Sequence, residues 1–370
     1  MAQSHPSPVQ DSVLFTEYGI PIRNLWHMLL YAWNEFPLDM AHRPEMVDVE
    51  RAPTLNALLA SILLKCMQGR LRIGLGRNYV NQEQALQGIR GRINFEQSIK
   101  HQAFERGEAV CEFQGYSANE PRNQIIRTTL ARLAQAGQFG PESNFAKALR
   151  HNLRQLCRDL DGIDLIELSP EMIRRPLQTR NDRDYRMMLG ICELVLQRQM
   201  PTETAGEHPL PAMQREALVL YHIYERFVAN FYRIQLDAWT VTPQKRLEWH
   251  ETPAESPYLP AMIPDLVLQE ISSGRWIILD TKFTARSLVE NQWGKPIFDS
   301  SHLYQLYAYL RSQEHVSERH RKATGILLYP AVHHKLSERI ELQDHVIRVE
   351  SLDLAAPWPE IERHLLALVA

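Results

Sequence analysis

The chain has 370 residues, of which 44% are hydrophobic and 23% charged, with a formal net charge of −3. This composition excludes an intrinsically disordered protein, and the length favours two domains with separate cores. Four cysteines without a CxxC pair argue against a zinc ribbon or a disulfide framework. The polar N-terminus lacks the pattern of a signal peptide, and no apolar run reaches the roughly 18 residues of a membrane span, so a cytoplasmic protein without membrane contact is expected.

Charge is distributed unevenly along the chain. Residues 61–180 hold 18 Lys or Arg against 12 Asp or Glu, whereas residues 201–300 hold 9 against 13. A basic segment suits contact with phosphates or an acidic partner surface, and an acidic segment suits a metal site. Solvated charged faces would give the same counts, so charge alone leaves both interpretations open.

The first part of the chain mixes helical and β-prone segments. Apolar residues at helical spacing predict helices at 20–36, 54–67, 123–136, 145–160 and 184–199, and Asn24 is expected to cap the first. From Arg70 to Phe95, short β-prone runs between glycines indicate strands joined by turns. Residues 1–19 are expected to form a disordered tail, and 20–200 a mixed domain of helices and a β-hairpin.

The second part begins after a stretch rich in Pro, Gly and charge at 201–212, which predicts a domain boundary there. Beyond it we predict a helix at 214–236, strands near Val241 and Trp249, strands at 265–269 and 276–283 around a turn at 272–274, a helix at 301–312 and a strand at 324–329. Such alternation predicts a sheet domain over 201–370. The fold class expected for the whole chain is α+β.

The most informative stretch is residues 263–283, IPDLVLQEISSGRWIILDTKF. Asp265 opens one predicted strand and Asp280 lies near the end of the next, so a hairpin would bring both carboxylates to one edge of the sheet. Period-two alternation puts Asp280 and Lys282 on the same face, with Thr281 pointing away. Two charges at the end of a buried strand are costly unless they are paired, hydrated or bound to a metal.

Two carboxylates beside a lysine suit metal-dependent hydrolysis of a phosphodiester. Carboxylate oxygens bind Mg²⁺ or Mn²⁺, and an ammonium group can orient water or neutralise developing charge. Asp265 and Asp280 are therefore candidate metal ligands and catalytic residues, and Lys282 a candidate catalytic residue. A purely structural Asp–Lys pair is the alternative, because a D-x-K triplet after an apolar run is common by chance.

Two predicted helices add polar residues to this set. Gln305 and Tyr309 are one helical turn apart, and the Q-x-x-x-Y arrangement after the lysine resembles the accessory catalytic pattern of RecB-like nucleases. Glu225 lies in an otherwise apolar and aromatic helix face, where it could supply a third carboxylate to the metal. The alternatives are a polar helix edge for the first pair and a solvated or salt-bridged side chain for Glu225.

Longer segments resemble the McrC family, nuclease subunits of modification-dependent McrBC restriction systems. They are IPIRNLWHMLLYAW (20–33), GIRGRINF (88–95), NEPRNQIIRTTL (119–130), the PD and DTK elements, LYQLYAYL (303–310) and GILLYP (325–330). The resemblance implies an N-terminal finger-like region that inserts into a hexameric AAA+ GTPase, McrB, and a C-terminal PD-(D/E)xK, restriction-endonuclease-like domain. It also implies a subunit that stimulates GTP hydrolysis by the partner and cleaves double-stranded DNA containing modified cytosine, as in phage defence.

The sequence has no G-x-x-x-x-G-K-[ST] phosphate-binding loop, so GTP is expected to act only through the partner. Candidate partner-binding residues are the arginines of the glycine-rich stretch: Arg70, Arg72, Arg77, Arg90 and Arg92. Two other functions stay open. One is a catalytically silent activator or scaffold of the GTPase, and the other is a stand-alone RecB-like repair nuclease.

Overall fold

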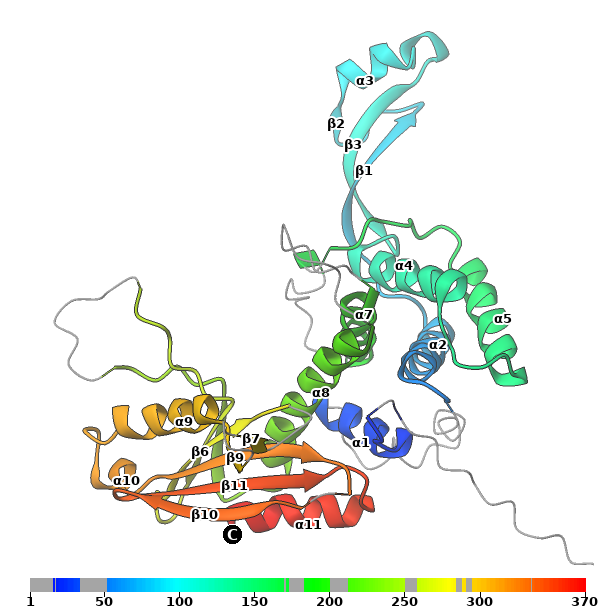
Figure 1. Cartoon of the computed structure of the whole chain (residues 1–370). Helices are drawn as coiled ribbons and strands as arrows, with labels where there is room; N and C mark the ends of the chain where they lie inside the picture. Colours follow the sequence, from blue (N-terminus) through cyan, green and yellow to red (C-terminus); the bar gives the residue numbers. More distant parts are fainter. Residues whose placement is uncertain are drawn as a thin grey trace, which may run out of the picture. The chain divides into compact units, whose positions relative to one another are not determined.

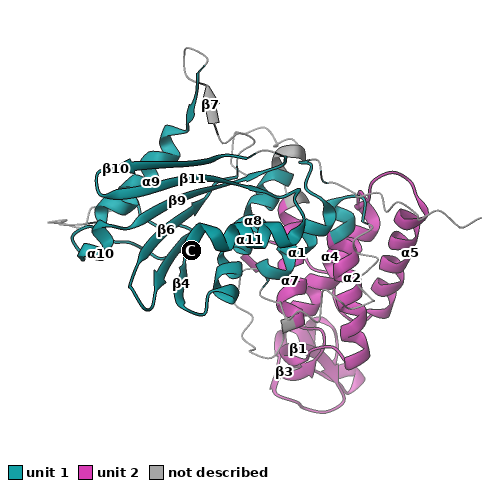
Figure 2. Ribbon diagram, turned by 90° about the horizontal axis from the view of Figure 1, so that it is seen from below, with its two compact units in different colours: residues 1–58, 201–370 teal, residues 59–200 magenta. Residues whose placement is uncertain are grey.

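The computed structural model describes residues 16, 18–33, 52–169, 171–172, 183–199, 212–249, 258–283, 288–290, 295–333 and 335–370. The chain divides into two compact units, coloured separately in Figure 2. The first consists of Met1–Leu58 with Pro201–Ala370, and the second of Leu59–Met200. Within the described part of the chain, no helix has the length and apolar character needed to cross a membrane.

A six-stranded mixed sheet with the order β10-β11-β9-β6-β5-β4 forms the centre of the first unit. Its strands are β4 (Trp239–Pro243), β5 (Leu266–Glu270), β6 (Trp276–Thr281), β9 (Thr324–Ala331), β10 (Ser337–Leu342) and β11 (His345–Asp353). β6, β9 and β11 are parallel, whereas β4, β5 and β10 are antiparallel to their neighbours. Every residue of β6 is buried, as its apolar sequence predicted for a strand covered on both faces. A separate pair, β7 (Leu288–Glu290) and β8 (Pro296–Phe298), follows β6.

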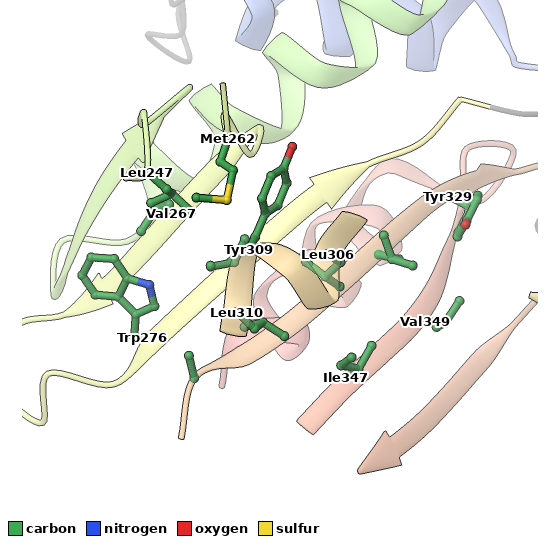
Figure 3. Close-up of a cluster of buried hydrophobic side chains, with 13 residues drawn as sticks. Leu247, Met262, Val267, Trp276, Leu306, Tyr309, Leu310, Tyr329, Ile347 and Val349 are labelled. Atoms are coloured by element: carbon green, nitrogen blue, oxygen red, sulfur yellow. The ribbon is translucent and has the colours of Figure 1, made fainter. Parts of the chain in front are cut away.

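Helices cover both faces of this sheet. The helices of the unit are α1 (Ile22–Ala32), α8 (Ala212–Gln235), α9 (Ser300–Ser312), α10 (Glu318–Arg321) and α11 (Trp358–Val369). In the apolar cluster of Figure 3, Leu306 and Leu310 of α9 pack with Ile347 of β11. The next residue of β11, Arg348, points to the opposite face and donates to the Leu368 carbonyl of α11 at 3.0 Å. The central strands are therefore enclosed between α9 and α11.

The N-terminal helix belongs to the first unit, whereas we predicted it in a domain spanning 20–200. α1 packs on α8, and the Asn230 side chain donates to the Ala32 carbonyl at 3.0 Å. Asn24 is also not the predicted N-cap, because Pro21 takes that place. The buried Asn24 amide instead donates to the carbonyls of Leu354 and Ala356, both at 2.8 Å. These partners are more than 300 residues away in sequence, so local patterns could not indicate them.

The predicted tail and linker fall largely outside the described residues. Residues 1–15, 17 and 201–211 are not described. Tyr18, which we predicted in the disordered tail, makes an edge-on contact with the Phe283 ring at 6.1 Å between centroids. Packed structure therefore begins before residue 20. Trp249, predicted near a strand, lies outside the strands, and its indole donates to the Pro260 carbonyl.

The second unit combines helices with an antiparallel sheet. Its elements are α2 (Leu55–Ile73, which begins in the first unit), β1 (Asn78–Leu86), β2 (Arg92–Ile93), α3 (Phe95–Lys100), a 3-10 helix (Phe104–Arg106), β3 (Ala109–Ser117), α4 (Pro121–Ala136), α5 (Asn144–Asp159) and α7 (Arg183–Gln199). β1 pairs with β3 from Asn78↔Ser117 to Leu86↔Ala109. Figure 1 shows these strands and α3 extending away from α4 and α5. The unit thus contains four of the five helices predicted for the first part of the chain. Strands β1 and β2 lie in the glycine-rich stretch as predicted, but both pair with β3, which was not predicted, rather than with each other. We call the segment 78–117 the finger.

Close packing of α9 on β9 depends on Gly325. A Cβ atom at this position would lie 2.9 Å from Leu306 Cδ2 and 2.9 Å from Leu310 Cδ1, and both leucines are fully buried. Gly325→Ala is therefore expected to lower the free energy of unfolding by about 1–3 kcal/mol, measured by chemical denaturation. Gly69→Ala in α2 is the control, because a Cβ there meets no atom within 4 Å, and it should not destabilise. Equal stability of both variants would contradict this packing.

Candidate functional site

The predicted hairpin forms and brings Asp265 and Asp280 to neighbouring strands. β5 and β6 are antiparallel, with Leu266 opposite Leu279. One residue further along this register, Asp265 lies opposite Asp280. Opposite residues of an antiparallel pair lie on the same face with Cβ atoms about 5 Å apart. The two carboxylates therefore meet at the end of β6, as the spacing predicted.

Asp265 is held by Thr281, which we predicted to point away from the strand face that carries Asp280 and Lys282. The Thr281 hydroxyl donates to Asp265 Oδ2 at 2.6 Å, and the Thr281 backbone N–H donates to the same oxygen at 2.8 Å. Thr281 is buried, and Asp265 is half-buried. The alternation of side chains along β6 did not predict this contact. Asp265 lies opposite Asp280, yet its carboxylate accepts hydrogen bonds from the following residue, Thr281. Two donors on one oxygen fix the orientation of the carboxylate.

Asp280 begins a chain of polar contacts that ends on α9. It is 2% exposed and forms an ion pair with Lys282 Nζ. Lys282 Nζ also donates to Gln305 Oε1 at 2.8 Å, and Gln305 Nε2 donates to the Tyr309 hydroxyl at 2.7 Å. Gln305 therefore contacts Lys282 directly, and Tyr309 is linked to the lysine through Gln305. We predicted both α9 residues from their one-turn spacing. Gln305 is exposed at the surface, so the buried pair leads outward to solvent.

Glu225 reaches the acidic pair through a residue that the sequence did not indicate. It lies on α8, and its Oε1 accepts a hydrogen bond from Gln244 Nε2 at 2.5 Å. The same Gln244 nitrogen lies 3.4 Å from Asp265 Oδ1. Gln244 follows β4 directly and carries neither charge nor motif, so no sequence signal marked it. Glu225 therefore neighbours Asp265 with an amide between them.

Burial and mutual repulsion shape the electrostatics of this group. Burial, followed by the charge of Asp280, raises the pKa of Asp265 to about 6. Burial also raises the pKa of Asp280, although the Lys282 ammonium opposes the change. Burial and the charge of Asp265 raise the pKa of Glu225. Crowded carboxylates with raised pKa values would be stabilised by a nearby cation.

The donor set suits a hard divalent cation in part. Mg²⁺ commonly takes one or two protein carboxylates and completes its shell with water and phosphate oxygens, which Asp265 and Asp280 could allow. The predicted set of three ligands is not assembled, because the Gln244 amide stands between Glu225 and Asp265. Within the residues that the structure describes, no three His, Cys, Asp or Glu side chains gather closely enough to hold a metal. The residues present therefore fit a cation on two carboxylates.

The five predicted partner-binding arginines lie in three places: the end of α2, the segment before β1 and the finger. Arg70 and Arg72 lie in the last turn of α2 rather than on the predicted strand, because the helix continues to Ile73. Arg70 contacts Asp184 at 3.4 Å and lies over the Tyr185 ring, so it is engaged within its own unit. The exposed arginines are Arg72, Arg77, Arg90 and Arg92. Arg77 lies just before β1, and Arg90 and Arg92 lie on the finger.

Fold and site together define a two-unit α+β protein with an acidic pair and a lysine at the end of a mixed sheet. The profile of the family described as McrBC 5-methylcytosine restriction system component matches residues 8–330. The chain belongs to this family, and the prediction made from its motifs is confirmed.

Individual relatives are distant in sequence. The chain is 27% identical over 352 residues to the type IV methyl-directed restriction enzyme EcoKMcrBC of Escherichia coli strain K12, covering 94% of this chain and 96% of the relative. A half-complex of Thermococcus gammatolerans McrB AAA+ hexamers with bound McrC is similar at 17% identity and a TM-score of 0.49, over 95% of this chain and 76% of that one. The T. gammatolerans McrBC complex gives 17% identity and a TM-score of 0.34, over 57% and 58%.

Proposed function

We propose that this chain is the DNA-cleaving subunit of an McrBC-type restriction system, a metal-dependent endonuclease with a PD-(D/E)xK site. The observation that carries the proposal is the convergence of Asp265, Asp280 and Lys282 at the end of the β5–β6 hairpin. Burying Asp280 as an ion pair with Lys282, next to a second carboxylate, is costly for a purely structural arrangement, because hydrophobic residues would fill the same space at least as well. The arrangement is therefore better explained by chemistry.

Each side chain has a distinct part in the proposed reaction. Asp265 and Asp280 would hold Mg²⁺ or Mn²⁺, which supplies Lewis acidity at the phosphate and a more acidic bound water. Lys282 would orient the attacking water or neutralise charge that develops on the phosphate. Gln305 holds the Lys282 ammonium from the α9 side, and Tyr309 holds Gln305. Both would keep the amine aimed at the substrate.

The partner and substrate follow from the family. We propose an McrB-like AAA+ GTPase hexamer as the partner, with GTP hydrolysis stimulated by this chain, and double-stranded DNA containing modified cytosine as the substrate. The family description, which names 5-methylcytosine restriction, supports this. The exposed Arg90 and Arg92 make the finger the candidate surface for the partner. An intact Asp265, Asp280 and Lys282 favour a cleaving subunit over a silent activator, and the family match along most of the chain argues against a stand-alone repair nuclease.

The test is cleavage of matched DNA substrates with and without 5-methylcytosine. The purified chain, a GTPase of the McrB type, GTP and Mg²⁺ should together cut the methylated substrate, and chelation of the metal should stop the reaction. Efficient cutting by the chain without GTPase or GTP would favour the stand-alone nuclease. GTPase stimulation without any cutting would favour the silent activator.

A further inference from the structure

Gln244 contacts both Glu225 and Asp265. Its side-chain amide donates to Glu225 Oε1 at 2.5 Å and lies 3.4 Å from Asp265 Oδ1. Its backbone N–H donates to the Asp265 carbonyl at 3.0 Å. A single residue thereby joins α8, which carries Glu225, to Asp265, the residue before β5.

The backbone of Gln244 is held in an unfavourable conformation. Its φ angle is +47°, in the left-handed region that residues with a side chain rarely adopt. Glycine would take this conformation without strain, and a turn after β4 needs no glutamine side chain. Strained backbone that persists is common at functional sites, where the side chain has a reason to be there.

The amide nitrogen also reduces the repulsion between Glu225 and Asp265. It carries partial positive charge and lies between two carboxylate oxygens that repel each other. Thr281 already fixes the Asp265 carboxylate, whereas the half-buried Glu225 would be free to rotate away from it without this donor. A site that must gather carboxylates for a metal gains affinity when they are held in place beforehand.

We propose that Gln244 is a positioning residue, which keeps Glu225 and Asp265 gathered so that the site binds its divalent cation tightly. This inference rests on the proposed function of the site. It assigns a role to a residue outside the PD and DTK motifs, and it gives Glu225 a supporting position around Asp265. The backbone hydrogen bond to Asp265 and the side-chain bond to Glu225 contribute separately, so they can be tested separately.

Gln244→Gly separates the two contributions. Glycine favours the positive φ and retains the backbone N–H, so the fold should be kept, while the amide bridge is lost. The affinity for Mg²⁺ alone, obtained in the absence of DNA from the dependence of Tm on Mg²⁺ concentration, should fall about tenfold. The Mg²⁺ concentration that gives half-maximal cleavage should rise by a similar factor, and Tm without metal should not fall.

Gln343→Gly is the matched control. Gln343 also has a positive φ, +55°, in the turn between β10 and β11, and its side chain contacts Tyr307 rather than the site. This variant should bind Mg²⁺ like the wild type. Equal or tighter Mg²⁺ binding by the folded Gln244→Gly variant would overturn the positioning role alone. A wild-type chain whose Tm does not respond to Mg²⁺ would overturn the metal site and this inference together.

Discussion

Replacing Asp280 with asparagine is expected to slow DNA cleavage by about a thousandfold while the chain stays folded. Asparagine preserves the shape of this buried side chain but removes the charge that pairs with Lys282 and would bind the cation. Lys282→Met should have an effect of similar size, because it removes the ammonium that Gln305 holds. Cleavage rates under single-turnover conditions, with Tm recorded for each variant, measure both effects.

The control for these variants is a buried acidic residue in the same sheet. Glu350 on β11 is 3% exposed and accepts a hydrogen bond from Arg348 at 2.8 Å, so Glu350→Gln also weakens a buried ion pair. It lies on β11, with β9 between it and the hairpin, and should leave cleavage by the folded protein close to the wild-type rate. Stimulation of the partner's GTPase should persist in the Asp280→Asn variant. Cleavage within tenfold of wild type by folded Asp280→Asn would contradict the site assignment.

Asp265→Asn should stabilise the protein at neutral pH even though it removes a proposed metal ligand. The pKa of Asp265 in the folded state is about 6, against an ordinary value of 3.8, because of burial and then the charge of Asp280. Above pH 6 the folded chain therefore carries a charge that disfavours folding, by on the order of 2–3 kcal/mol. The oxygen of the introduced amide can still accept both hydrogen bonds from Thr281. We expect a higher Tm than wild type at pH 8, together with loss of cleavage.

The stability difference between Asp265→Asn and wild type should increase with pH. Below about pH 4 Asp265 is protonated whether the chain is folded or unfolded, so the variant and wild type should have similar stability. Between about pH 4 and 6 the unfolded chain has lost this proton while the folded state still binds it, so the wild type should lose stability relative to the variant as pH rises through this range.

Asp299→Asn is the control for this pH dependence, because the pKa of Asp299 is lowered in the folded state whereas that of Asp265 is raised. The Ser301 hydrogen bonds lower the pKa of Asp299, so this variant should not stabilise at high pH. An Asp265→Asn variant less stable than wild type at pH 8 would contradict the cost assigned to the charged Asp265, which comes from burial and then from the charge of Asp280.

Local patterns in the sequence determined much of this protein. Apolar periodicity placed α4, α5, α7, α8 and α9 within a few residues, because these helices bury one face each. The spacing from Pro264-Asp265 to Asp280 predicted the hairpin, since a short turn between two apolar runs leaves few other pairings. The Q-x-x-x-Y spacing likewise predicted that Gln305 and Tyr309 meet, because residues four apart share a helix face.

Only the tertiary structure decided the rest, because the contacts involved join residues that are distant in sequence. The strands β10 and β11 and the helix α11 were not predicted, since their pairing and packing are set by the sheet they join. α1 packs on α8, and Asn24 of α1 donates a hydrogen bond to the Leu354 carbonyl. Local sequence patterns cannot predict contacts between residues so far apart in the chain. Thr281 and Gln244 carry no motif, and their roles around Asp265 arise when separate segments meet at one point. Sequence thus determined which groups could do the chemistry, and the fold determined which neighbours hold them.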